Sequence, residues 1–156
     1  LATNLNIKKA SLFHHYPSKN ALAVELYRFY QTAFLNWTAK YTHLSAEKQI
    51  ITYAERLTTW ICEKERVCPV GALSLEWSLV DPALQEEIIK LHKIQKTWLT
   101  NLFKTIQKQH GLRISIQEAV LQTMGLMQGS IQLARINHDP QMVIKNIKSY
   151  LKMIKE

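Results

Sequence analysis

The sequence of 156 residues contains only four glycines, four prolines and two cysteines. So few helix breakers, together with abundant Leu, Lys, Gln, Ile and Glu, predict an all-α protein. Cys62 and Cys68 are too few for a disulfide framework, so the cytoplasm is the expected compartment. The pattern leaves open whether either thiol has a redox role or is a buried structural group.

Long apolar runs and catalytic signatures are also missing. No run approaches the roughly 20 apolar residues of a membrane-spanning helix. The chain begins at Leu1 rather than at methionine, so we expect its N-terminus to be incomplete. It has no nucleophile elbow, Gly-rich phosphate loop or HExxH motif. Cys62, Cys68 and His92 lack the paired spacing of a zinc site, and adjacent helical histidines diverge by about 100°. We therefore expect no catalysis, metal, cofactor or membrane association.

Acidic residues are scarce, because 12 Asp and Glu stand against 20 Lys and Arg, a formal net charge of +8. This excess favours an anionic partner such as nucleic acid, although many soluble proteins are basic. Residues 1–40 hold five Lys or Arg and a single acid, Glu25. In the basic stretch 145–155 lysines alternate with apolar residues, which is typical of the solvated face of a helix. The N-terminal cluster is therefore the better candidate for an anion site.

Residues 1–22 are the most informative stretch of the chain. Two short helical runs, 1–5 and 8–16, flank Asn6-Ile7, and a longer helix starts after Pro17-Ser18. The second run combines lysines, a serine and two histidines with a few apolar residues, which suits a helix with one face packed and one face exposed. This arrangement is typical of a helix-turn-helix, whose second helix enters the DNA major groove.

The same stretch resembles the DNA-binding signature of the tetracycline-repressor (TetR) family of transcriptional regulators. The resemblance covers about the first two dozen residues and rests on Leu1-Ala2, Asn6-Ile7, the run 8–11, Leu12, Phe13, His14, His15, Tyr16, Ser18 and Lys19. Asn6 stands where the family has Gly, and it tolerates left-handed backbone geometry. The family's first helix is missing from this sequence, so we expect an incomplete head.

The candidate DNA contacts are polar residues of the second run, one of its aromatic residues and the next lysine: Lys8, Lys9, Ser11, Phe13, His14, His15 and Lys19. All except Lys8 fall at positions where the resembled family contacts DNA. Lysine suits phosphates, whereas Ser and His can reach phosphates or base edges. Phe13 lacks the hydroxyl of the family's usual Tyr. Without the resemblance, such a basic helix face would more often be only solvated.

Capping residues and apolar periodicity predict the remaining helices. The resemblance makes the first of them, from Ser18 to Tyr41, a linker helix. Ser45 begins the next helix, and Pro69 and Gly71 interrupt the chain before a short helical piece at about 72–79. The last three helices begin at Asp81-Pro82, at the capping box 115–118 and at Asp139-Pro140. We divide the chain into a head with its linker helix, 1–41, and a ligand-binding and dimerisation domain, 42–156.

The last two helices are apolar on more than one face, which predicts self-association. Gly125 and Gly129 leave a smooth strip for another helix, either of the same subunit or of a second copy. The resemblance favours a homodimer, because TetR regulators dimerise through their last two long helices, and a dimer suits two DNA half-sites. The candidate interface residues are Val120, Met124, Gly125, Gly129, Ile131, Val143, Ile147, Tyr150 and Leu151.

Aromatic, methionine and polar residues of the body are candidates for an effector pocket: Tyr53, Trp60, Trp77, His92, Trp98, Phe103, Met124, Met127 and Gln128. Any one of them alone is more often a core residue. The resembled family builds a ligand cavity among these helices, which implies a small apolar or aromatic effector. A looser resemblance of residues 68–76 and Asp81-Pro82 is to a subgroup related to multidrug-responsive repressors.

Together these patterns predict a homodimeric repressor that binds double-stranded operator DNA and is released by a small-molecule effector. The alternative is an all-α small-molecule-binding or dimerisation module without DNA-binding activity.

Overall fold

The computed structural model describes residues 8–59 and 68–156, and the candidates Trp60 and Cys62 lie outside them. The described residues are helical, without a strand, as the composition predicts. The elements are α1 (Lys9–His15), α2 (Lys19–Lys40), α3 (Ala46–Leu57), α4 (Pro69–Ser74), a 3-10 helix η3 (Trp77–Leu79), α5 (Pro82–His110), α6 (Ile116–Ile136) and α7 (Gln141–Met153).

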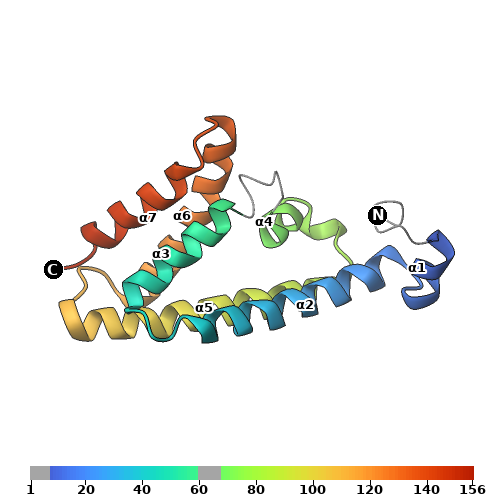
Figure 1. The fold of residues 1–156 in the computed structure, drawn as a ribbon, viewed down its shortest axis with the longest axis horizontal. Helices are drawn as coiled ribbons and strands as arrows, with labels where there is room; N and C mark the ends of the chain where they lie inside the picture. The colour runs from blue at the N-terminus through green and yellow to red at the C-terminus, as the bar shows by residue number, and fades with distance from the viewer. Residues whose placement is uncertain (1–7, 60–67) are drawn as a thin grey trace.

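Two long helices, α2 and α5, run side by side along the molecule (Figure 1). The small α1 projects beyond one end of this pair, while α3, α6 and α7 pack together near the other end (Figure 1). The 22-residue helix α2 therefore leads from α1 along α5 into the body. Among the described helices, none combines the length and the apolar character that crossing a membrane requires.

Side-chain caps begin α2, α3, α5 and α6 where the sequence predicts them, whereas α7 begins at Gln141, just after the predicted Asp139-Pro140, and its N-cap Pro140 provides no side-chain cap. The N-caps whose side-chain oxygen accepts a backbone N–H of the first turn are Ser18, Ser45, Asp81 and Ser115. Ser115 forms the predicted capping box, because Glu118 Oε2 accepts the Ser115 backbone N–H at 2.9 Å. Gly111 ends α5 with φ of 72°, a conformation that L side chains rarely adopt.

The segment around Pro69 differs from the prediction. Pro69 and Gly71 were expected to precede a helical piece that starts near Ala72, but α4 begins at Pro69 and contains Gly71. Proline is tolerated in the first turn of a helix because its missing N–H would have no intrahelical partner there. A Cβ at position 71 would lie 2.6 Å from Gln128 Oε1, the far end of a flexible side chain that comes from α6.

The core has two parts that meet at one joint. The larger part lies among α3, the second half of α5, α6 and α7, with Ile50, Phe103 and Ile147 almost completely buried. The smaller part lies between α2 and the first half of α5. Tyr53 and Trp98 pack against both parts, so the linker helix and the body share one continuous apolar interior.

Candidate nucleic-acid interface and the joints behind it

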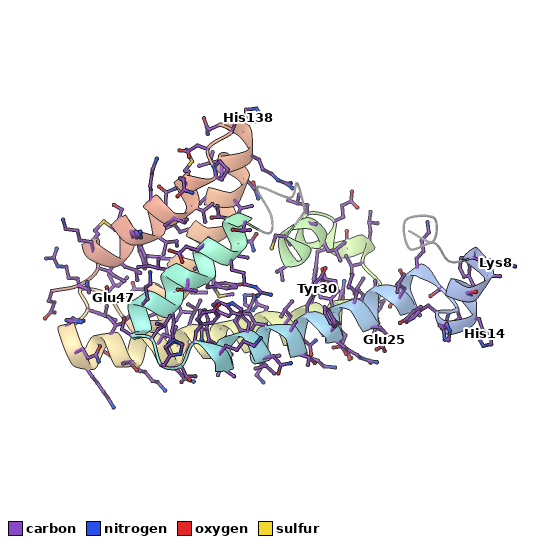
Figure 2. All side chains as sticks on the ribbon, in the orientation of Figure 1. Lys8, His14, Glu25, Tyr30, Glu47 and His138 are labelled. Carbon is purple, nitrogen blue, oxygen red and sulfur yellow. The ribbon has the colours of Figure 1, made fainter. Side chains whose placement is uncertain are left out.

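The helix α1 and the residues beside it present most of the predicted DNA contacts to solvent. Lys8, Ser11, Phe13, His14, His15 and Lys19 are all exposed, whereas Tyr16 is half-buried as expected for the packed side. The side chain of Lys9 is outside the described set. Lys8 and His14 lie at the free end of the molecule, far from Glu47 at the opposite end (Figure 2). The end of the molecule opposite the body therefore carries cationic and hydrogen-bonding groups.

His14 and His15 are in edge-to-face contact, with ring centroids 5.3 Å apart and an interplanar angle of 75°. Ser11 and His14 are three residues apart and so share a face of the helix, together with His15. Within residues 8–59 and 68–156, no group of three or more His, Cys, Asp or Glu side chains could hold a metal ion. These imidazoles are available to donate to phosphate oxygens or base edges.

An open cleft of about 800 Å³ lies where the head meets the body. His15 and Tyr16 of the head line it together with Glu25 of α2 and Asp81 at the start of α5. The cleft is open to solvent and has a mixed polar and apolar lining, and it shares no residue with the predicted effector pocket. It shows that the first turn of α5 reaches the base of the head.

Behind the head, a buried carboxylate joins α2 to α5. Glu87 of α5 is only 4% exposed. Its Oε2 accepts a hydrogen bond from Gln31 Nε2 at 2.7 Å, and its backbone carbonyl accepts a second one from the same nitrogen at 3.1 Å. Its Oε1 accepts from Lys90 Nζ at 2.9 Å and from Arg28 Nε at 3.4 Å. We call Glu87 with Arg28, Gln31 and Lys90 the carboxylate clamp.

Hydrogen bonds determine the charge state of the clamp. The hydrogen bond from Lys90 above all, with those from Gln31 and Arg28, lowers the pKa of Glu87 below its ordinary value, although burial acts in the opposite direction. The pKa of Arg28 is raised by its hydrogen bond to Glu25 and, to a smaller extent, by Glu87. Glu87 is therefore ionised at neutral pH and held by donors from both helices.

Further from the head, four aromatic rings connect α2 to both α3 and α5. Phe34 and Trp37 of α2, Tyr53 of α3 and Trp98 of α5 make all six possible pair contacts, with ring centroids 5.4–6.2 Å apart. Most pairs are edge-to-face, a favourable geometry for aromatic rings. Gln95 Nε2 donates to the Tyr53 hydroxyl at 3.0 Å, and burial raises the pKa of that hydroxyl. We call these four rings the aromatic cluster.

The predicted effector residues do not gather in one place. Tyr53 and Trp98 belong to the aromatic cluster, and Phe103 and Met127 are buried in the larger core. His92 on α5 is exposed, and Trp77 on η3 is 37% exposed. Met124 is half-buried against the larger core. Gln128 Nε2 donates to Cys68 Sγ at 3.1 Å, which ties α6 to the start of α4.

Sequence reasoning missed the carboxylate clamp. Leu84, Ile88 and Leu91 form an apolar stripe on α5, and Glu87 lies on the same side of the helix. An acid among buried apolar residues requires hydrogen-bond partners from a neighbouring element. That pattern was a usable signal for the position of Glu87, but it could not identify the partners on α2.

The outer surface of α6 and α7 carries the predicted glycine strip. Gly125 and Gly129 are exposed, and no atom lies within 4 Å of a Cβ built on either. The reading that a helix of the same subunit packs against them is therefore wrong for the described residues. Gly125 and Gly129 line an open groove of about 430 Å³ between α6 and α7. Leu121 and Leu133 on α6 are 57% and 49% exposed.

Most other predicted interface residues pack inside the subunit itself. The ones buried in its larger core are Val120, Ile131, Val143, Ile147, Tyr150 and Leu151. The Tyr150 hydroxyl also donates to the Ala119 carbonyl oxygen at 3.3 Å. These residues hold α6 against α7 and offer little area to a second copy. The exposed residues at the predicted strip are instead Gly125 and Gly129, with Leu121 and Leu133 beside them.

Solved structures share this arrangement of helices. A TetR-family transcriptional regulator from Agrobacterium tumefaciens superposes with a TM-score of 0.87 at 19% identity, over 99% of this chain and 84% of its own. A TetR transcriptional regulator from Legionella pneumophila gives 0.80 at 22%, over 99% and 83%. A regulatory protein TetR from Rhodobacter sphaeroides gives 0.85 at 15%, over 98% and 85%. The chain has the fold of the TetR regulators.

The identities to these three TetR structures do not exceed 22%, so the likeness establishes the fold and leaves the ligand open. The sequence matches no protein-family model and no curated protein. The shared fold extends over the head as well as the body, because the superpositions cover 98–99% of the chain. The TetR architecture therefore includes both α1 and the face of α6 and α7.

Proposed function

We propose that the protein is a homodimeric, ligand-responsive transcriptional repressor and not an enzyme. The observation that supports this most directly is the exposure of Ser11, His14 and His15 on α1, with the exposed Lys8 before the helix and Lys19 after it, at the free end of a TetR fold. In this proposal residues 1–41 are the DNA-binding head with its linker helix, and residues 42–156 form the ligand-binding and dimerisation domain.

On DNA, the exposed residues of the head would divide their roles. Lys8, Lys9 and Lys19 contact phosphates on either side of the groove, which fixes the position of the helix. Ser11 and His14 share one face of α1 and reach base edges in the major groove. Affinity then depends on salt through the lysines, whereas sequence preference depends on the residues between them.

The dimer would form through the outer surface of α6 and α7. Two copies that meet along Gly125 and Gly129 approach closely, because neither glycine has a side chain and the strip is open. Leu121 and Leu133 beside the strip supply apolar area that is exposed in the single subunit. A two-fold dimer presents two α1 helices to half-sites about 34 Å apart.

The effector would act through the linker helix. We propose a small molecule with an apolar or aromatic body, in keeping with the looser resemblance to multidrug-responsive repressors. The carboxylate clamp and the aromatic cluster attach α2 to α5, so a change in the position of α5 moves the head. An effector that favours one of two arrangements changes the spacing of the two heads, and operator affinity falls.

Operator binding measured against salt tests the DNA-binding role. The full-length protein should bind DNA from upstream of its own gene, and log affinity should fall linearly with log salt concentration. Lys9→Ala and Lys19→Ala should each flatten that slope by about 1. Lys104→Ala, an exposed lysine of the body, should leave it unchanged. Failure of the full-length protein to bind such DNA at all would favour the module without DNA-binding activity.

Sedimentation tests the dimer. Leu133→Glu places a charge beside the glycine strip and should convert the dimer into monomers, because an unpaired charge in an apolar interface is costly. Phe29→Glu is the matched control, since Phe29 is 64% exposed on α2, away from this surface. Equal dissociation by both variants would place the interface elsewhere.

A further inference from the structure

A second groove lies along the seam between the linker helix and α5. It has a volume of about 600 Å³ and is lined by residues of α2 and α5 only. The lining residues of α5 extend from Lys90 to Asn101, which is about 16 Å at the rise of an α-helix. The groove therefore has the shape of a short channel between two parallel helices.

Apolar side chains form the floor of this seam groove. Leu35 of α2 is 52% exposed, and Ile94 and Trp98 of α5 are half-buried beside it. The exposed residues of α2 nearest to Leu35, namely Thr32, Asn36 and Ala39, are polar or small. The apolar surface of Leu35 therefore continues only toward Ile94 and Trp98 in the groove. An apolar chain placed along these three residues would cover surface that the protein leaves open.

The rim of the seam groove is cationic. Lys90 and Lys93 line it, and no acidic residue is among the lining residues that the structure describes. Lys90 Nζ is already engaged by Glu87 at 2.9 Å. Lys93 makes no ion pair with any residue of the described chain. One lysine at the rim is therefore available to an anion, next to an apolar floor.

We propose that the seam groove binds an amphipathic carboxylate such as a medium-chain fatty acid. The alkyl chain lies on Leu35, Ile94 and Trp98, and the carboxylate pairs with Lys93. Such a ligand touches both α2 and α5, so it favours one relative position of the two helices. This inference rests on the proposed function and names the ligand class of the repressor. The groove is built without α6 and α7, so the proposed dimer leaves it open.

Calorimetric titration with octanoate tests the site without DNA. Octanoate should bind the 156-residue chain, and Lys93→Glu should weaken binding at least about tenfold, because a charge-assisted contact becomes a repulsion. Leu35→Glu should weaken it similarly by placing a charge on the apolar floor. Octanol, which lacks the carboxylate, should bind about tenfold more weakly than octanoate. All the substituted side chains are exposed, and circular dichroism checks that each variant folds.

Two matched variants serve as controls. Ile89→Glu and Lys104→Glu change an exposed apolar residue and an exposed lysine of α5 that do not line the groove. Both should bind octanoate as the unchanged chain does. The proposal is overturned if octanoate does not bind, if the controls lose binding as much as the groove variants do, or if octanol binds as tightly as octanoate.

The proposed function and this site fail in different ways. If the protein binds octanoate but no operator, the proposed ligand site stands and the proposed repressor function is wrong. If the protein binds its operator through α1 but does not bind octanoate, the proposed repressor function stands and the proposed ligand site is wrong. Octanoate that binds without changing operator affinity in the full-length protein overturns the regulatory part of the inference.

Discussion

Two of the contacts that hold the linker helix to the body are of opposite character. Nearer the head, the carboxylate clamp uses Glu87, a charged group with directed hydrogen bonds. Further along, the aromatic cluster uses four uncharged rings, most of them packed edge to face. Hydrogen bonds to a single carboxylate specify which residues of α2 and α5 lie opposite one another, whereas ring packing contributes mainly stability. The chain thus separates the register of the linker helix from the strength of its attachment.

Of the changes to these two contacts, removing an aromatic ring should lower the free energy of unfolding most. Phe34→Ala should lower the free energy of unfolding by about 3–5 kcal/mol, because Phe34 is buried and touches the other three rings. Urea unfolding measures the change. Phe29→Ala, on the same helix but 64% exposed, should cost less than about 1 kcal/mol. Similar losses for the two variants would show that the cluster does not secure the linker helix.

Neutralising the clamp should have a smaller, pH-dependent effect. Glu87→Gln should lower the free energy of unfolding by about 1–2 kcal/mol at pH 7, since charge-assisted hydrogen bonds become neutral ones. The folded-state pKa of Glu87 is lowered from 4.5, so its contribution is fully present above that value and is lost as pH falls through the folded pKa.

The stability difference between the unchanged chain and Glu87→Gln should therefore shrink as the pH is lowered below about 4.5, when urea unfolding is repeated at each pH. Glu86→Gln, at a neighbouring and exposed position, is the control and should show a much smaller difference. A Glu87→Gln difference that does not change with pH would mean that the charge of the clamp contributes nothing.

The polar group of the aromatic cluster should matter least. Tyr53→Phe keeps the ring but removes the hydroxyl that accepts from Gln95 at 3.0 Å. The loss should be about 1 kcal/mol in urea unfolding, the usual net value of a hydrogen bond. Gln95→Ala combined with Tyr53→Phe should cost less than the sum of the two single changes. Additive losses would show that this hydrogen bond does not stabilise the cluster.

Helix boundaries were the part of the fold that the sequence specified best. Ser18, Asp81 and Ser115 act as caps through contacts within one helical turn, so a short stretch of sequence contains all the information. The start of α4 was predicted wrongly because Gly71 looks like a helix breaker. The Gln128 side chain that lies close to Gly71 comes from a helix far along the chain, so the local sequence could not show this contact.

The candidate sites were predictable only where they depend on one helix. The pattern of polar and apolar residues within α1 was enough to predict that Ser11 and His14 are exposed, without the resemblance. The interface residues required knowledge of which apolar face α7 covers. Periodicity shows that Val120 and Ile131 are apolar, but only the packing of α6 on α7 shows that both are buried within the subunit. The clamp and the seam groove each combine two helices and were not found.

The aromatic cluster provides a spectroscopic signal of how the linker helix lies against α5. The indoles of Trp37 and Trp98 lie with centroids 5.9 Å apart at an angle of 74°, and one belongs to α2 and the other to α5. Such close indoles share their excitation, so the near-ultraviolet circular dichroism of the pair depends on their mutual angle. Any ligand that shifted α2 against α5 would change this signal, so the proposed switching can be tested in the native protein without an attached label.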